Sequence, residues 1–155
     1  MSVDLDDLLR TAVVEVFGTM LGLEIHPEPP STPIPGGSST IAAAVGFIGS
    51  LNGLVYIYAA EPFAVRITDK LIGLNGDRGH RDEMVNDSMG ELANMIVGHF
   101  KSRLSDRGNS CSLTIPSIVR GTSFQIEPVS SSIRRVISFR SMDTQLVAEL
   151  MLRPE

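Results

Sequence analysis

The segment Thr40-Ile-Ala-Ala-Ala-Val-Gly-Phe-Ile-Gly-Ser-Leu-Asn-Gly-Leu-Val-Tyr-Ile-Tyr-Ala-Ala60 decides the fold, because it contains twenty consecutive residues, Ile41 to Ala60, without a charge. A helix of that length could span a bilayer. The centre of the segment argues against this, since Asn52-Gly53 is typical of a type I′ hairpin turn, in which both residues tolerate a positive φ. The two flanks suit strands. We therefore predict a buried β-hairpin, and a membrane span is the alternative.

The size and charge of the chain limit its class. With 155 residues and 43% hydrophobic content, it is long enough to bury one sizeable core, so we expect a single domain over residues 1–155. The formal net charge is −5, and the 13 basic residues are spread along the chain. Because nucleic-acid binding needs a concentrated basic surface, DNA and RNA are not expected partners.

Cysteine and histidine usage points to a cytoplasmic protein with no metal or other cofactor of its own. Cys111 is the only cysteine, which excludes an internal disulfide, and the acidic N-terminus is unlike a secretion signal. The three histidines, His26, His80 and His99, lack the spacing of metal ligands. The run Gly36-Gly-Ser-Ser-Thr40 lacks the lysine of a phosphate-binding loop.

Three segments have the apolar spacing of helices. The first runs from Asp4 to Leu21 and is followed by Gly22, which is typical of a helix end. The second, Glu61 to Ile72, has a proline in its first turn, where proline is favoured. The third is a long helix from about Arg81 to Leu104. Between the first helix and the hairpin, residues 26–39 are rich in Pro and Gly. We expect an extended surface connection there, without regular structure.

The last third of the chain predicts short strands. They cover Cys111 to Val119, a segment around Phe124 to Ile126, Arg135 to Arg140, and Gln145 to Leu152. Pro116 should place its strand at an edge or a bulge, because proline has no N–H to donate. The order of elements predicts an α+β fold in which helices cover a largely antiparallel sheet.

A faint internal echo suggests that the fold consists of two pseudo-repeated halves. Thr11–Gly22 aligns with Asp87–Gly98, so that Glu15 matches Glu91 and the apolar residues stay in step. Gly18 stands where the second segment has Asn94.

The long helix contains the pattern E-x-x-N twice, at Glu83/Asn86 and at Glu91/Asn94. At about 100° per residue, the second pair lies within roughly 40° of a single polar line, while the opposite arc is apolar. Glu83 lies in the first turn, where its carboxylate interacts favourably with the helix dipole. Asn86 lies at the border of the apolar arc. The line consists of Asp87, Glu91, Asn94, Gly98, Lys101 and Ser105.

The second pair suits one kind of chemistry. Asn94 can donate to and accept from a water and so orient it for in-line attack, while Glu91 can pair with a lysine on a substrate. Gly98 lowers the stability of the helix by about 1 kcal/mol relative to alanine. Because it has no side chain, it leaves room for another backbone or loop to approach the helix on the side of Glu91 and Asn94. Met84 and Met95 flank the line and could contribute to a docking surface.

These residues carry a resemblance. Asp87-x-x-x-Glu91-x-x-Asn94, followed by Met-Ile-Val-Gly98, resembles the D/S-x3-E-x2-N signature of the CheC/CheX/FliY chemotaxis phosphatases, and the CheX branch most of all. Phe17-Gly-Thr-Met-Leu-Gly22 and Ile115-Pro-Ser-Ile-Val-Arg-Gly121 fall in the order that this family shows.

The resemblance implies a CheC-like fold and hydrolysis of the phospho-aspartate of a CheY-like response regulator. Asn94 would orient the water, Glu91 would pair with the regulator's lysine, and Mg²⁺ would belong to the regulator. Asp87, Met95, Gly98 and Lys101 would contact the partner. Because Gly18 replaces the amide in the echo, a single site is expected, and the family likeness also implies a homodimer.

Three other functions stay open from the sequence. Glu91 and Asn94 could be ordinary solvated polarity on a helix. The chain could also be a non-catalytic module that binds regulators or flagellar-switch components, or a scaffold subunit that uses its sheet edge.

Overall fold

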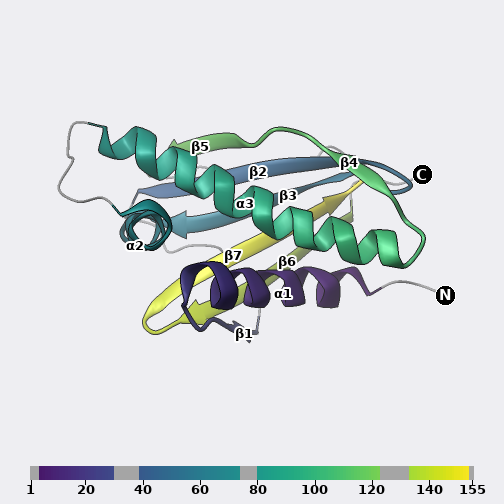
Figure 1. The fold of residues 1–155 in the computed structure, drawn as a ribbon, viewed down its shortest axis with the longest axis horizontal. Helices are drawn as coiled ribbons and strands as arrows, with labels where there is room; N and C mark the ends of the chain where they lie inside the picture. Colours follow the sequence, from purple (N-terminus) through teal and green to yellow (C-terminus); the bar gives the residue numbers. More distant parts are fainter. Residues whose placement is uncertain (1–3, 30–38, 74–79, 123–132, 154–155) are drawn as a thin grey trace.

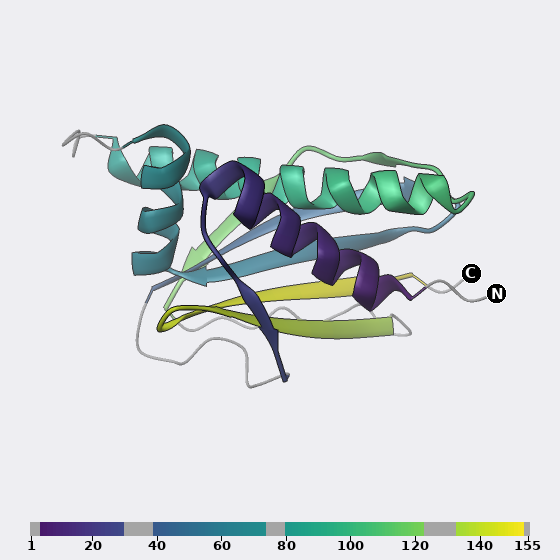
Figure 2. The ribbon, with the colours of Figure 1, turned by 60° about the horizontal axis from the view of Figure 1, so that its bottom comes forward.

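The computed structural model describes residues 4–29, 39–73, 80–122 and 133–153, in which three α-helices lie on one face of an antiparallel sheet (Figure 1, Figure 2). This confirms the predicted α+β class. A π-helical turn, η1, directly follows the first helix. The elements are α1 (Leu5–Val16), η1 (Phe17–Leu21), β1 (His26–Glu28), β2 (Thr40–Gly49), β3 (Gly53–Ala60), α2 (Glu61–Ile72), α3 (Arg81–Asp106), β4 (Cys111–Leu113), β5 (Ser117–Gly121), β6 (Ile133–Ser141) and β7 (Thr144–Leu152).

The sheet has the order β1-β6-β7-β3-β2-β4, and β5 pairs with β2 on the same side as β4. The predicted strand Cys111 to Val119 is therefore wrong in its middle, where Thr114–Pro116 separates two short strands. Both strands lie at the edge of the sheet, as the proline predicts, because Pro116 cannot donate to a ladder. The segment around Phe124 to Ile126 lies outside the described residues.

The predicted hairpin is confirmed, but its turn differs from the prediction. β2 and β3 pair from Thr40↔Ala60 to Phe47↔Gly53. Within the described residues, positive φ occurs only at Met142 and three glycines elsewhere, so Asn52-Gly53 is not a type I′ turn. Asn52 acts through its side chain instead, whose Oδ1 accepts a hydrogen bond from Gly49 N–H at 2.9 Å.

The helices follow the sequence prediction closely. Asp4 caps α1 by accepting from the N–H of Asp7 at 3.1 Å, and Gly22 ends η1 with φ of 65°. Pro62 lies in the first turn of α2, and α3 extends two residues beyond the predicted Leu104. None of the helices in the described parts of the chain is long and apolar enough to cross a membrane.

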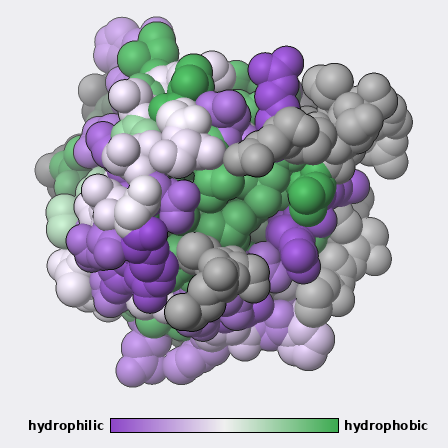
Figure 3. Space-filling model, turned by 90° about the vertical axis from the view of Figure 1, so that its right-hand side faces the viewer, coloured by the Kyte–Doolittle hydropathy of each residue, from purple (hydrophilic) through white to green (hydrophobic). Residues whose placement is uncertain are grey.

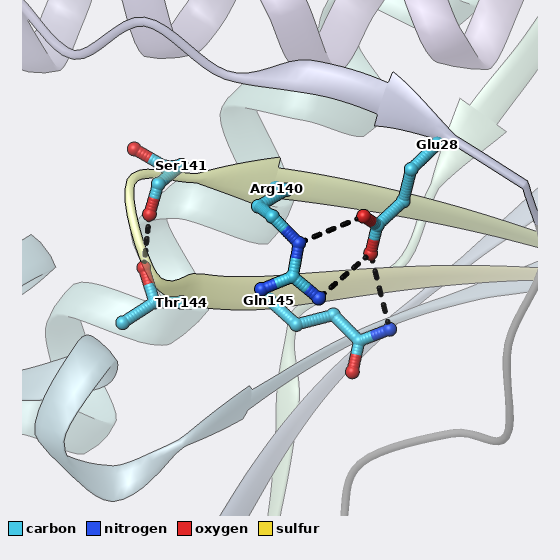
Figure 4. Close-up of polar contacts among 5 residues, drawn as sticks. All are labelled: Glu28, Arg140, Ser141, Thr144 and Gln145. Carbon is cyan, nitrogen blue, oxygen red and sulfur yellow. Dashed lines mark hydrogen bonds and ion pairs between the residues drawn. The ribbon is translucent and has the colours of Figure 1, made fainter.

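The prediction that residues 26–39 lack regular structure is wrong at their start. His26–Glu28 forms β1, which pairs with β6. Arg140 of β6 donates to both carboxylate oxygens of Glu28, at 2.8 and 3.4 Å, and Gln145 donates to one of them at 3.4 Å (Figure 4). The sequence could not show this, because the partners lie more than a hundred residues away. Residues 30–38 lie outside the described part.

Alternation along β2 and β3 divides the sheet into two faces. Val45 and Phe47 face the helices, where the Phe47 ring meets Phe100 of α3 edge-on at 5.6 Å. The opposite face carries a buried carboxylate, Glu149, to which Arg134 donates at 2.6 Å and the Tyr58 hydroxyl at 3.4 Å. Because Phe100 packs against Phe47 in the core, the side of α3 that carries Phe100 faces the sheet.

Apolar surface remains accessible at the end of the molecule where β3 begins and β7 ends (Figure 3). Leu54, near the start of β3, is 39% exposed, and Ile133, which pairs with Leu152 at the same end, is 49% exposed. α1 and α3 lie side by side on the helical face (Figure 1). The relation between two pseudo-repeated halves stays a prediction.

Candidate functional site

The outer side of α3 presents the polar line that the sequence predicts. Asp87, Glu91 and Asn94 are exposed, and Gly98 and Lys101 are partly exposed. The inner side is buried because the helix lies over the sheet with its apolar arc inward. The buried residues of α3 include Val85, Met89, Leu92, Ala93, Ile96, Val97, Phe100 and Leu104.

Glu91 and Asn94 are available to a partner. They are one helical turn apart, a spacing that places Cβ atoms about 5–6 Å from each other. Among the residues that the structure describes, neither side chain has a hydrogen-bond or ion-pair partner. A carboxylate and an amide therefore face solvent together, with their bonding capacity unused.

The first E-x-x-N pair is engaged within the fold. The carboxylate of Glu83 lies 3.6 Å from Nδ1 of His80, at the start of the helix. Asn86 accepts a hydrogen bond from Nε of Arg120 on β5, and the Arg120 guanidinium also lies 3.8 Å from the carboxylate of Asp82. These contacts tie the first half of α3 to the sheet edge, so Asn86 has a structural role.

The segment of α1 that aligns with the site, around Glu15, also has contacts within the fold. The carboxylate of Glu15 pairs with Arg103 of α3, and it lies 3.6 Å from Nδ1 of His99. Gly18 is exposed and offers no amide beside it. Glu15 therefore stabilises the contact between α1 and α3. Sequence reasoning missed this pairing, because Glu15 and Arg103 lie 88 residues apart in the chain.

The two glycines of α3 have different surroundings. A Cβ built on Gly90 would lie 3.4 Å from the Pro116 ring, so this glycine is where the β4–β5 connector approaches the helix. A Cβ built on Gly98 would meet nothing within 4 Å in the described structure. No contact with another described residue explains Gly98, which lies one turn beyond Asn94 on the outer side of the helix.

Met95 and Lys101 border the pair. Met95 is half-buried and packs against the core, so only part of its side chain is available to a partner. Lys101 influences Cys111, the only thiol. Burial raises the pKa of the Cys111 thiol, an effect that the positive charge of Lys101 opposes. A thiol with a raised pKa is a poor nucleophile at neutral pH. Within the described ranges, no three His, Cys, Asp or Glu side chains gather to hold a metal ion.

Comparison with known proteins assigns the chain to a family. The family model described as chemotaxis phosphatase CheX matches residues 41–140, which include the whole of α3. The chain belongs to the CheX family. No match was found among curated protein sequences.

Solved structures of CheX and CheC-like proteins share the fold. A CheX from Desulfovibrio desulfuricans has 23% identity and a TM-score of 0.83, and the match covers 97% of this chain and 100% of that one. A CheC-like protein from a Shewanella species has 25% identity and a TM-score of 0.81, with 99% and 100% covered. The CheX–CheY–BeF3–Mg complex from Borrelia burgdorferi has 22% identity and a TM-score of 0.77, also with 99% and 100% covered.

Proposed function

We propose that this CheX-family protein hydrolyses the phospho-aspartate of a CheY-like response regulator in the cytoplasm. The observation that carries the proposal is the pair Glu91/Asn94, which is exposed and unpartnered among the described residues on the outer side of α3. The family's description as a chemotaxis phosphatase supports the reaction class. The Borrelia structure, in which a CheX is complexed with CheY, supports the class of partner.

Asn94 is assigned to the attacking water. Its amide can accept a hydrogen bond from the water and donate one to it, which fixes the direction of the water's lone pair. The water oxygen then bonds to phosphorus while the bond from phosphorus to the aspartyl oxygen breaks. The products are the free carboxylate and inorganic phosphate, and the water gives up a proton to solvent or phosphate. Catalysis of this kind is mainly positioning.

Glu91 is assigned to the regulator rather than to the water. One turn from Asn94, its carboxylate can pair with a lysine beside the phosphoryl group and so hold the partner in register. Mg²⁺ is expected on the regulator. Asp87, Met95, Gly98 and Lys101 surround the pair and are proposed to contact the same partner.

Substitution in both E-x-x-N pairs tests the proposal. The regulator is phosphorylated with acetyl phosphate, and loss of phosphate is followed with and without this protein. We expect Asn94→Ala to lower the acceleration about 100-fold, the scale of lost positioning. Glu91→Ala should lower it about tenfold, which corresponds to roughly 1.4 kcal/mol.

The first pair supplies matched controls. Glu83→Ala and Asn86→Ala should stay near wild type at temperatures where both variants are folded, because Glu83 and Asn86 already have contacts within this chain, with His80 and Arg120. Equal losses in both pairs would contradict the assignment. Wild-type protein that binds the phosphorylated regulator without accelerating hydrolysis would establish the non-catalytic binding module instead.

The family likeness also leads us to propose a homodimer. The accessible apolar side chains Leu54 and Ile133, near one end of the sheet, are compatible with a further contact between copies.

A further inference from the structure

The connector between β4 and β5 carries the most exposed large apolar side chain of the described residues. Ile115 is 85% exposed, whereas the next, Met142, is 79% exposed and lies in the distant β6–β7 turn. A single exposed apolar residue is common on protein surfaces and needs no explanation by itself. The position and the rigidity of Ile115 distinguish it.

The backbone around Ile115 is fixed. The N–H of Thr114 donates to the carbonyl of Gly46 at 2.9 Å, and the Thr114 hydroxyl accepts from the N–H of Gly46 at 2.8 Å. The strands on either side, β4 and β5, both pair with β2. Ile115 is therefore held in solvent by a bonded connector.

The connector approaches α3 at Gly90, the residue that directly precedes Glu91 in the chain. The Pro116 ring lies 3.4 Å from the position of a Cβ on Gly90, and the side chain of Ile118 approaches the same point at 3.9 Å. Gly90 lies about 40° from Asn94 around the helix, one turn away. The connector thus forms a border on the Asn94 side of the open surface.

A protein partner that reaches Asn94 must also cover this border. A standard interface buries about 800 Å² on each partner, which corresponds to a patch of about 16 Å radius. Ile115 adjoins a proline in contact with the helix at Gly90, so it falls well inside a patch centred on Glu91 and Asn94. Burial in such a patch would remove its apolar surface from water.

We propose that Ile115 is an apolar anchor for the response regulator, which makes the docking surface two-sided, with the polar line of α3 and the β4–β5 connector. This inference rests on the proposed function. Ile115 is not a catalytic residue, because it has no group that could act on water or phosphate. Its contact is the same before and during the reaction, so its loss should raise KM and leave kcat unchanged.

The test compares Ile115→Ser with a matched substitution at Ile48. Ile48 is 63% exposed near the same sheet edge, and it follows Phe47 on β2, so it lies on the face away from α3. Steady-state dephosphorylation is measured with the source organism's single-domain response regulators, charged with acetyl phosphate. Binding is measured with the same regulators loaded with beryllofluoride and Mg²⁺. Melting curves verify that each variant is folded.

Ile115→Ser is expected to raise KM and the dissociation constant on the order of tenfold, a typical effect of truncating an interface anchor, with kcat within about twofold. Ile115→Leu should have a KM and a dissociation constant close to those of the wild type, and Ile48→Ser should match the wild type. The inference is overturned if wild type is active and Ile115→Ser has the same KM, or if Ile48→Ser is equally impaired. Wild-type protein that neither hydrolyses nor binds would remove the proposed function, and this inference with it.

Discussion

At the scale of single residues, the two tyrosines have an unusual environment. Tyr56 and Tyr58 stack at 6.0 Å between ring centroids on the sheet face away from the helices. Burial, with a further contribution from the charge of Glu149, raises the pKa of both phenols, that of Tyr58 more strongly. The folded protein therefore favours the neutral phenols.

The raised pKa values predict a loss of stability at high pH. An unfolded chain releases these protons near pH 10, and the folded chain holds them at higher pH. Stabilisation from the phenols is complete below pH 10 and declines as the pH rises above it. Tyrosinate absorbance should rise only above pH 10 in the folded protein and at about pH 10 in guanidinium. Ordinary titration of both phenols while the protein stays folded would contradict this account.

At the scale of elements, α3 retains a glycine that its own packing does not require. Gly98→Ala should stabilise the protein by about 1 kcal/mol, because alanine favours the helix and no atom of the described residues lies within 4 Å of the new methyl group. The same variant should weaken binding of the regulator, if the partner's backbone approaches there. Thermal unfolding and the dephosphorylation assay together measure both effects.

Gly90→Ala is the control within the same helix. Its methyl group would contact the Pro116 ring at 3.4 Å, an ordinary packing distance, so stability should be equal or higher with little change in regulator binding. If Gly98→Ala gains stability without loss of activity, the open surface beside Asn94 is not a close contact with the partner.

At the scale of the whole molecule, the proposed homodimer predicts the mass in solution. Light scattering over a range of concentrations should give a species of twice 16.7 kDa that dissociates on dilution. Burial of exposed apolar surface such as that of Ile133 is the expected driving force. A constant mass of 16.7 kDa up to high concentration would contradict the proposal.

The sheet extends beyond the range that the family model matches. The matched range, residues 41–140, leaves out β7, which lies inside the sheet between β6 and β3. It also leaves out α1, which covers the helical face and holds α3 through Glu15 and Arg103. We therefore propose that the matched range forms one cooperative unit with α1 and β7.

The sequence by itself determined the local features of this protein. Periodicity predicted the three helices and the outward direction of Glu91 and Asn94, because the core side of a helix depends on neighbours only a few residues away. The Asn52-Gly53 turn signal between two strand-like flanks predicted the hairpin. Turn residues were less reliable, since Asn52 uses its side chain rather than a positive φ.

Only the tertiary structure decided which polar groups are already engaged. Asn86 is bound by Arg120 across 34 residues, and Glu15 by Arg103 across 88, so neither partner can be found from local spacing. The same is true of the connector that places Ile115 beside α3. Contacts of this kind form because the sheet brings distant segments together. Of the two E-x-x-N motifs, the first has contacts with other described residues. Glu91 and Asn94 of the second have none, so their polar groups remain available to a partner.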